Sequence, residues 1–338
     1  MKGVLMGVSG GIDSLAASLY FKENKYNVIP AYIILTDMHS NKADSVRKLY
    51  DSFGMKVEVK DERRLFKEKV IDYFSNAYRV GITPNPCAMC NRMIKFPLLK
   101  KYSEEFECDF FSTGHYVRIL NRRIFKAKDE SKDQSYFLST VKKEDLDKFI
   151  NTPLADAKKK DIRERLIDKI EITEKESQEI CFIDNNDYAD FLETYRGFKE
   201  QRGSFIDDEG MKIGEHRGYY RYTVGERRNL GMGFNRRMYV KSVDSEKNEV
   251  HLTDRENLKS KRFSIEIIEM FEKLSDKEYL VKTRYRQKEV PGRASLTSEN
   301  SADIILNEDM EAITPGQICA VYEKDMVVAS GFITKETW

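Results

Sequence analysis

The stretch MGVSGGIDS, Met6–Ser14, follows Val4 and Leu5 near the start of the chain. The pattern predicts a buried β-strand that passes through a glycine turn into a helix. In α/β proteins such a turn presents the unpaired N–H groups of a helix N-terminus to an anion, often a phosphate. We therefore expect a phosphate-binding loop here, with an ordinary strand-to-helix turn as the alternative.

The loop lacks the lysine of the common nucleoside triphosphate motif G-x-x-x-x-G-K-[ST]. Asp13 is placed to hold a metal ion against the phosphates, and the hydroxyls of Ser9 and Ser14 add hydrogen-bond donors. These features predict nucleotide binding that serves a reaction other than γ-phosphate transfer.

The first part of the chain alternates between short apolar runs rich in β-forming residues and longer helical patterns. This order predicts βαβ units and a parallel sheet, which binds ligands at the carboxyl ends of its strands. The glycine loop and the stretch STGH, 112–115, should therefore lie on one edge. The predicted strands are 4–8, 28–35, 56–61 and 108–114, and the predicted helices are 14–24, 41–53 and 64–78.

The pattern changes in the second half. Residues 140–195 are mostly helical in pattern and highly charged, and glycines cluster beyond residue 200. Short strands with polar turns then predict a small β-barrel at the C-terminal end. The predicted strands are 237–244, 249–254, 278–286, 292–298, 301–307, 318–325 and 326–333.

Charge narrows the choice of partners. Of the 338 residues 34% are charged, yet the net charge is only +1, so a polyanion must be bound by local basic patches rather than by a global field. Arginine alternates with tyrosine in three of these patches, which favours a nucleic acid. The patches are 157–165, 217–228, 235–241 and 281–293.

No apolar run is long enough to span a membrane, and the N-terminus leads into a strand rather than a signal peptide. We expect a cytoplasmic protein with no membrane partner. Its five cysteines should then be reduced, so that any disulfide is transient and catalytic.

The stretch TPNPCAMCNRMIKF, Thr83–Phe96, carries a C-x-x-C pair. Pro86 suits the first position of a helix capped by Asn85, so Cys87 and Cys90 should lie in its first turn and on one face. A helix N-terminus lowers the pKa of a thiol, which predicts a nucleophilic thiolate. A third cysteine, Cys181, lies in ESQEICFI, 176–183.

Four interpretations of these thiols stay open. They are buried structural residues, a zinc site, a redox or sulfur-carrying pair of Cys90 and Cys181, or an iron–sulfur cluster on Cys87, Cys90 and Cys181 with one iron site open. A second C-x-x-C is missing and only four histidines occur, which argues against zinc. The Cys90–Cys181 pair is preferred. Cys108 and Cys319 have the pattern of strand-core residues.

Eight motifs, in order and along nearly the whole chain, resemble the tRNA-specific 2-thiouridylases (MnmA family), which belong to the PP-loop ATP pyrophosphatases. They are SGGIDS, TPNPCAMCNRMIKF, STGHY, KDQSYFL, ESQEICFI, GEHRGYYRYTVGERRNLG, VKTRYRQ and TPGQICAVY. The resemblance implies a parallel-sheet PP-loop domain of α/β class over 1–196, a small central domain over 197–257 and a C-terminal β-barrel over 258–338. The last two would bind tRNA.

Members of this family are tRNA-uridine 2-sulfurtransferases, which replace the 2-oxygen of the wobble uridine by sulfur. The resemblance implies that ATP, with Mg²⁺, adenylates the 2-carbonyl oxygen and releases pyrophosphate. A persulfide then displaces AMP. In the family's scheme Cys181 corresponds to the persulfide carrier, and Cys90 completes the transfer through a transient disulfide. The sulfur would come from a donor protein, a cysteine desulfurase or a relay, or from inorganic sulfide.

Matched residue by residue, the family pattern implies the catalytic residues Cys90, Cys181, Cys87 and Asp13 and three sets of contacts. One of the contact residues, His115, has a purely structural role as its alternative. The ATP set is Gly7, Val8, Ser9, Gly10, Gly11, Ile12, Asp13, Ser14, Ile33 near the adenine, and Gly114. The set facing the target base is Asn85, Pro86 and Cys87. The remaining tRNA or base contacts are His115, Lys132, Asp133, Gln134, Arg284, Tyr285 and Gln317.

Three departures from the family pattern matter. Many members have aspartate where this chain has Cys87, so a general base is not assumed there, and the extra thiol favours the cluster alternative, in which a bound hydrosulfide attacks. The segment TDMHSNKADS, 36–45, is shorter than usual and lacks the family's cysteine. Glu226 stands where glutamine is typical.

Two rival functions remain. Another PP-loop adenylating enzyme, such as an amidotransferase or a lysidine-type synthetase, would not need Cys90 and Cys181. A non-catalytic RNA-binding protein would release no pyrophosphate.

Overall fold

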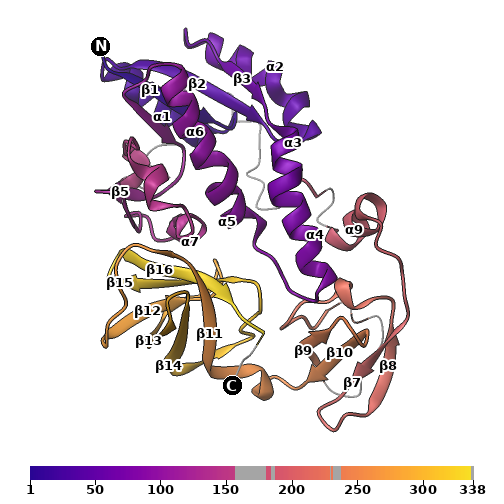
Figure 1. Ribbon diagram of the computed structural model, residues 1–338. Helices are drawn as coiled ribbons and strands as arrows, with labels where there is room; N and C mark the ends of the chain where they lie inside the picture. Colours follow the sequence, from indigo (N-terminus) through magenta and orange to yellow (C-terminus); the bar gives the residue numbers. More distant parts are fainter. Residues whose placement is uncertain (157–179, 184–186, 229, 231–236, 336–338) are drawn as a thin grey trace. The chain divides into compact units, whose positions relative to one another are not determined.

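The computed structural model describes residues 1–156, 180–183, 187–228, 230 and 237–335. The chain divides into two compact units, each with its own hydrophobic core. Unit 1 takes its residues from Met1–Val70, Cys87–Phe182 and Asp325–Val327, and unit 2 from Ile71–Pro86, Ile183–Lys324 and Val328–Trp338. Figure 1 labels the helices and strands of both.

Unit 1 is built on a four-stranded parallel sheet of order β3-β2-β1-β4. Its register places Val4 opposite Val28 on one side and opposite Phe110 on the other. The parallel sheet predicted from the alternation of strands and helices is confirmed. The strands are β1 Gly3–Val8, β2 Asn27–Ile34, β3 Glu58–Asp61 and β4 Phe110–Thr113, and the first helices are α1 Ile12–Glu23, α2 Asp37–Asp51 and α3 Arg63–Phe66.

A helix with one π-helical turn leads into β4. It consists of α5 Pro86–Cys90, the π segment Asn91–Lys95 and α6 Phe96–Glu105, and it begins at Pro86 as predicted. The N–H of Phe96 donates to the carbonyl of Asn91, five residues earlier. Pro97 explains this wider turn, because proline has no N–H and its ring clashes with the carbonyl four residues before it.

The core of unit 1 lies between the sheet and its helices. Val4 and Met6 on β1 are fully buried with Leu15 and Phe21 on α1, and burial of each such side chain contributes about 1.5–3 kcal/mol. The remaining elements of the unit are β5 Arg118–Leu120, β6 Arg123–Phe125, α7 Ser135–Leu138 and the 3₁₀ turns Lys143–Leu146 and Pro153–Ala155.

In its described residues, unit 2 contains two α-helices, a small sheet and a barrel. Asp187 caps α9 by accepting the N–H of Asp190, and Gly197 ends the helix with φ +70°. The small sheet has the order β8-β7-β10-β9. The elements are α4 Asp72–Arg79, α9 Tyr188–Arg196, β7 Gly203–Ile206, β8 Lys212–His216, β9 Tyr239–Asp244 and β10 Glu249–Thr253, with 3₁₀ turns at Tyr219–Arg221 and Glu256–Leu258. A π turn, Lys67–Ile71, begins in unit 1 and leads into α4.

The barrel closes where β11 pairs with both β14 and β16. Its strand order in the described chain is β11-β14-β13-β12-β15-β16, which confirms the predicted C-terminal β-barrel. The strands are β11 Lys259–Met270, β12 Glu278–Lys282, β13 Val290–Ser298, β14 Ser301–Glu311, β15 Ile318–Glu323 and β16 Met326–Ile333. None of the described helices combines the length and the apolar character needed to cross a membrane.

Candidate active site

The glycine loop between β1 and α1 is held by bonds between hydroxyls and the backbone. Gly10 has φ +82°, a left-handed conformation that favours glycine. Ser9 Oγ accepts the N–H of Gly11 at 3.2 Å, and Ser14 Oγ accepts the N–H of Ser9 at 3.2 Å. No described side chain caps α1. A preformed loop with backbone donors at a helix N-terminus suits an anionic ligand.

The end of β4 touches this loop. The strand order reverses between β1 and β4, which is where open α/β sheets bind ligands. A Cβ atom on Gly114 would lie 2.9 Å from the Ser14 nitrogen, so a side chain at this position would displace the loop. The prediction that the two stretches share one edge of the sheet is confirmed. Ile33 lies on β2, the neighbour of β1.

Asp13 is oriented by a chain of hydrogen bonds. The hydroxyl of Tyr116 donates to Asp13 Oδ1 at 2.9 Å. Gln134 Oε1 in turn accepts the N–H of Tyr116 at 2.9 Å, and the N–H of Gln134 donates to the Tyr116 carbonyl at 2.9 Å. The side chain of Gln134, expected to contact tRNA, therefore supports Asp13 from inside the unit.

Asp133 is likewise occupied within the fold. Its buried carboxylate accepts the N–H of Ala127 at 2.9 Å and the hydroxyl of Ser135 at 2.7 Å. Lys132 donates its backbone N–H to Asp129. Because Asp133 is buried and engaged in these hydrogen bonds, its role in the structure is to hold the turn in place. The neighbouring Lys132 is half exposed.

Three cysteines gather in unit 1. Cys87 is exposed, Cys181 is half-buried and Cys90 is buried, and all three thiols are free. Ionisation of Cys181 or Cys87 raises the pKa of Cys90, and ionisation of Cys87 raises the pKa of Cys181, so the three thiols lie within electrostatic reach of one another. The structure thus brings together the three cysteines that the sequence singled out, whereas Cys108 and Cys319 are buried outside this group.

Burial controls the protonation of these thiols. It raises the pKa of Cys90 to about 12 and that of Cys181 to about 11. The pKa of Cys87 is also raised, because protein atoms crowd its thiol although the residue reaches the surface. The expectation that the helix N-terminus lowers the pKa of Cys87 and Cys90 is wrong. Loss of water around a thiolate outweighs the dipole of α5, which has only five residues.

One ammonium group acts on all three thiols. Lys95, half-buried at the end of the π segment, opposes the effect of burial and lowers the pKa of Cys90, Cys181 and Cys87. Sequence reasoning missed Lys95, although it lies in the quoted motif. The signal was Pro97 two residues later, which forces the turn that moves Lys95 around the helix.

Two histidines share the environment of Lys95. Burial first and Lys95 second lower the pKa of His115 to about 3, and the same causes, with Lys42, lower that of His39 to about 4. Both imidazoles are therefore neutral at pH 7. His115 Nδ1 lies 2.9 Å from Thr113 Oγ1, and its ring lies 6.2 Å from that of Phe96. His115 therefore lies within electrostatic reach of Lys95 and also contacts the end of β4, beside the glycine loop.

The cluster that the sequence left open on Cys87, Cys90 and Cys181 is not shown by the structure. Among the described residues, no three His, Cys, Asp or Glu side chains are placed to hold a metal ion. We therefore assign no step to a cluster.

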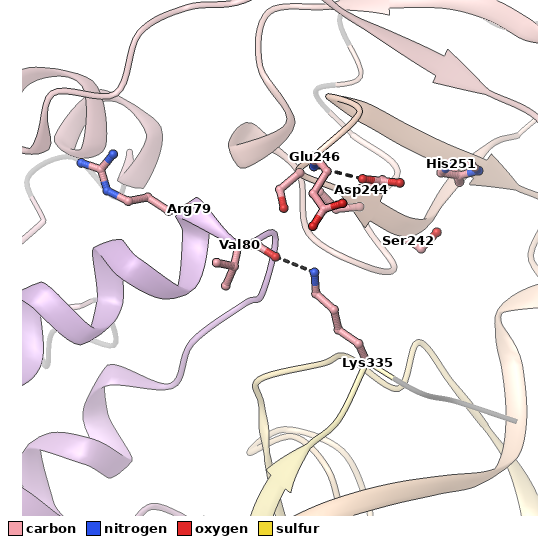
Figure 2. A pocket seen from close by; sticks show the side chains of 9 residues that line it. Arg79, Val80, Ser242, Asp244, Glu246, His251 and Lys335 are labelled. Carbon is pink, nitrogen blue, oxygen red and sulfur yellow. Dashed lines mark hydrogen bonds between the residues drawn. The ribbon is translucent and has the colours of Figure 1, made fainter.

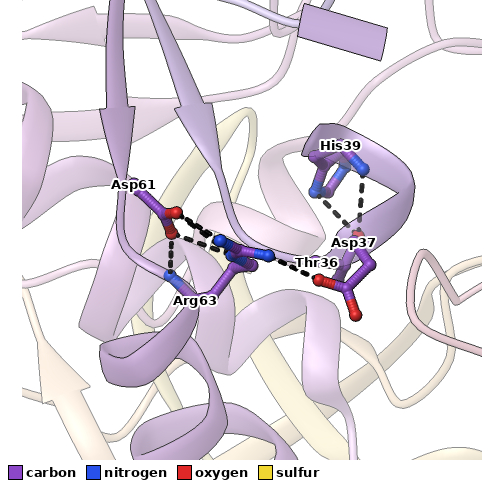
Figure 3. Close-up of polar contacts among 5 residues, drawn as sticks. All are labelled: Thr36, Asp37, His39, Asp61 and Arg63. Atoms are coloured by element: carbon purple, nitrogen blue, oxygen red, sulfur yellow. Dashed lines mark hydrogen bonds and ion pairs between the residues drawn. The ribbon is translucent and has the colours of Figure 1, made fainter. Parts of the chain in front are cut away.

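The short segment 36–45 after β2 starts α2 directly (Figure 3). Thr36 caps the helix by accepting the N–H of His39 at 3.3 Å. Arg63 joins Asp37 to Asp61 at the end of β3, with nitrogen–oxygen distances of 2.6 Å to each. These ion pairs fasten the loop end only weakly, because solvent screens exposed charges.

In unit 2, the TPGQ turn holds the segment that precedes Cys87 in sequence. Gln317 Nε2 donates to the carbonyls of Thr83 at 3.1 Å and Pro84 at 2.9 Å, and the N–H of Thr83 donates to Pro315 at 3.1 Å. Asn85 donates its N–H to the Tyr73 hydroxyl at 3.4 Å. Gln317, expected to face tRNA, therefore fixes the backbone that leads to the predicted base-facing residues.

Arg284 links two loops of unit 2. Its guanidinium donates to the carbonyl of Val224 at 2.9 Å and to the hydroxyl of Thr314. The ring of Tyr285 lies 5.9 Å from Lys282 Nζ. The Val224 loop belongs to the basic patch 217–228, so Arg284 supports that patch from the barrel.

A pocket of about 590 Å³ also opens in unit 2 (Figure 2). Two of its charged groups, Lys335 and Asp244, are already engaged. Lys335 Nζ donates to the Val80 carbonyl at 2.6 Å, and Asp244 accepts the N–H of Glu246 at 3.0 Å. None of the predicted site residues lines this pocket, and we assign it no function.

Three protein-family models match the chain in succession. They are the tRNA methyl transferase HUP domain at residues 2–185, the tRNA methyl transferase PRC-barrel domain at 189–254 and the aminomethyltransferase beta-barrel domain at 260–333. A solved structure described as a predicted subunit of tRNA methyltransferase from Methanocaldococcus jannaschii shares 18% identity with a TM-score of 0.37, covering 58% of this chain and 89% of its own. That likeness is too low to add to the assignment.

Curated relatives match along nearly the full length. The tRNA-specific 2-thiouridylase MnmA of Campylobacter lari is 36% identical, covering 98% of this chain and 99% of its own. MnmA of Sulfurimonas denitrificans is 34% identical and MnmA 1 of Clostridium botulinum is 36% identical, each covering 98% of both chains. With the parallel-sheet domain, the central domain and the closed barrel in the expected order, this chain belongs to the MnmA family of tRNA-specific 2-thiouridylases.

Proposed function

We propose that the protein is an ATP-dependent sulfurtransferase that converts the wobble uridine of tRNA into 2-thiouridine. The observation that carries the proposal is the presence, in one compact unit, of a lysine-free phosphate loop and a group of three thiols. Lys95 acts on those thiols and on His115, which follows the Gly114 that touches the loop. The names of the relatives support the substrate and the chemistry.

The first step is adenylation. The loop from Gly7 to Ser14 binds the phosphates of ATP, with the adenine near Ile33. The uridine O2 attacks the α-phosphorus, and the bond to pyrophosphate breaks. Asp13 would hold Mg²⁺ against the phosphates, which fits because this ion is usually bound by one or two carboxylates together with substrate phosphates. Mg²⁺ would neutralise the charge of the leaving pyrophosphate.

The second step is sulfur transfer. A donor, either a protein persulfide or inorganic sulfide together with an oxidant, loads a sulfane sulfur on Cys181. The terminal sulfur attacks C2 of the activated uridine, and AMP leaves with the original oxygen. The Cys90 thiolate then attacks Cys181 Sγ, so that the sulfur–sulfur bond to the uridine breaks and a Cys90–Cys181 disulfide forms. An external thiol reduces this disulfide.

The three thiols have different tasks in this scheme. Cys181 carries sulfur, Cys90 releases it, and Cys87, with Asn85 and Pro86, faces the base. No general base is assigned to Cys87, because burial raises its pKa. Lys132, Arg284, Tyr285 and Gln317 lie on or support the surfaces proposed to contact tRNA.

The test separates the two steps. Purified protein is given ATP, a tRNA transcript with a wobble uridine, and a persulfide donor, and both pyrophosphate and 2-thiouridine are measured. Cys181→Ser and Cys90→Ser should keep pyrophosphate release and lose 2-thiouridine, whereas the control Cys108→Ser should keep both. Thiolation by both site variants would favour another PP-loop chemistry. Absence of tRNA-dependent pyrophosphate release from the wild type would favour a non-catalytic RNA-binding protein.

A further inference from the structure

The π segment decides which face of the helix Lys95 occupies. In an α-helix a residue five positions after Cys90 lies about 140° around the axis from it. The turn Asn91–Lys95 is instead closed by the bond from the Phe96 N–H to the Asn91 carbonyl, and a turn bonded over five residues brings Lys95 back toward the face of Cys90. The helix thereby turns a lysine toward the cysteines.

Lys95 has no carboxylate counter-ion in the described part of the chain. It is half-buried and forms no ion pair or hydrogen bond with any described residue, whereas Lys60 in the same unit pairs with Glu105 at 2.5 Å. Partly buried ammonium groups are normally paired. An unpaired one near reactive side chains indicates an anion that is present only during function.

The groups around Lys95 identify that anion. The titratable and charged side chains that interact with it are the thiols of Cys87, Cys90 and Cys181 and the imidazoles of His115 and His39, with Lys42 beyond His39. None of these carries a negative charge unless a thiol ionises. The partner within reach is therefore a sulfur anion, a thiolate or a persulfide.

We propose that Lys95 is a positioning residue, the counter-ion that holds the sulfur anion of this group during transfer to the activated uridine. This inference rests on the proposed function. The ammonium stabilises the Cys181 persulfide anion before attack on C2 and the Cys90 thiolate before attack on Cys181 Sγ. A phosphate of ATP is the competing ligand, because His115 connects Lys95 to the strand end beside the loop.

The experiment compares Lys95→Met, Lys95→Arg and the control Lys60→Met, which removes a half-buried lysine that already has a partner. The first readout is the rate at which iodoacetamide alkylates Cys181 and Cys90 in the folded protein at pH 8, mapped by peptide mass. This readout needs neither ATP nor tRNA. The second is the pair of rates for pyrophosphate release and for 2-thiouridine formation.

Lys95→Met should slow alkylation and thiolation about tenfold or more, while pyrophosphate release stays within about twofold of the wild type. Lys95→Arg should recover most of both losses, because it restores the charge, and Lys60→Met should change neither. Unchanged alkylation in Lys95→Met would overturn the inference. Loss of pyrophosphate release with normal alkylation would assign the ammonium to phosphate instead. Failure of the wild type to thiolate tRNA would reject the proposed function, while the alkylation rates would still test Lys95.

Discussion

Replacing Gly114 with alanine is expected to disable the nucleotide loop from across the sheet edge. The added Cβ would lie 2.9 Å from the nitrogen and 3.0 Å from the Cα of Ser14. These are backbone atoms of the first turn of α1, so the loop itself must move. Overpacking of this kind costs about 1–3 kcal/mol. If this free-energy cost is paid in the conformation that binds ATP, the affinity for ATP drops about tenfold for each 1.4 kcal/mol.

Gly292→Ala is the matched control. Its Cβ would lie 2.7 Å from the Ile305 carbonyl in the barrel, so it should lower the free energy of unfolding by a similar amount without touching the loop. Urea unfolding measures the free energy of unfolding, and equilibrium dialysis measures the affinity for ATP. Gly114→Ala should weaken ATP binding by about fivefold to about 140-fold, the range that 1–3 kcal/mol gives, and Gly292→Ala should bind ATP normally. Wild-type ATP affinity in Gly114→Ala would refute the assignment of the site to this edge.

Four further outcomes follow. Burial raises the pKa of Glu226 in the folded protein above its value in the unfolded chain. Its protonated form therefore contributes full stability below the unfolded-state pKa, and this stability is lost as the pH rises through the folded-state pKa. Glu226→Gln should have a higher melting temperature than the wild type at pH 7 and a similar one at pH 4, and a difference in melting temperature that does not change with pH would contradict this. Gln317→Ala removes two hydrogen bonds to Thr83 and Pro84 and should lower the unfolding free energy by about 1–3 kcal/mol and slow thiolation, as measured by urea unfolding and 2-thiouridine yield. The alkylation rate of Cys181 should keep rising about tenfold per pH unit from pH 8 to 10, because burial raises its pKa to about 11; a plateau near pH 9 would show an unperturbed thiol. The logarithm of the tRNA association constant, measured by filter retention, should fall linearly with the logarithm of the salt concentration. An affinity that does not depend on salt would remove the case for basic patches.

The sequence predicted the scaffold well where a local pattern determines it. Strand β1 was recognised from its apolar run, and α5 was expected to begin at Pro86 because proline suits a first helical position. Strands β7 and β8 were not predicted, because glycines and charged residues dilute their alternation. The alternation of Phe263, Ile265 and Ile267 would have revealed β11.

The site was predicted less completely, because burial is a tertiary property. The three cysteines were identified from their motifs, but the direction of their pKa shifts was reversed by desolvation that no local pattern reports. The role of Gln134 toward Tyr116 depends on a contact between residues 18 positions apart. The importance of Lys95 depends on a π turn, which only Pro97 signalled in the sequence.

The most direct test of the account is a single turnover of protein loaded with one persulfide on Cys181, supplied with ATP and tRNA in the absence of reductant. Peptide mass analysis counts the Cys90–Cys181 disulfides, and nucleoside analysis counts the 2-thiouridines. The account predicts one disulfide for each 2-thiouridine, and neither product without ATP. Full yield of 2-thiouridine with Cys90 and Cys181 still unlinked would contradict it.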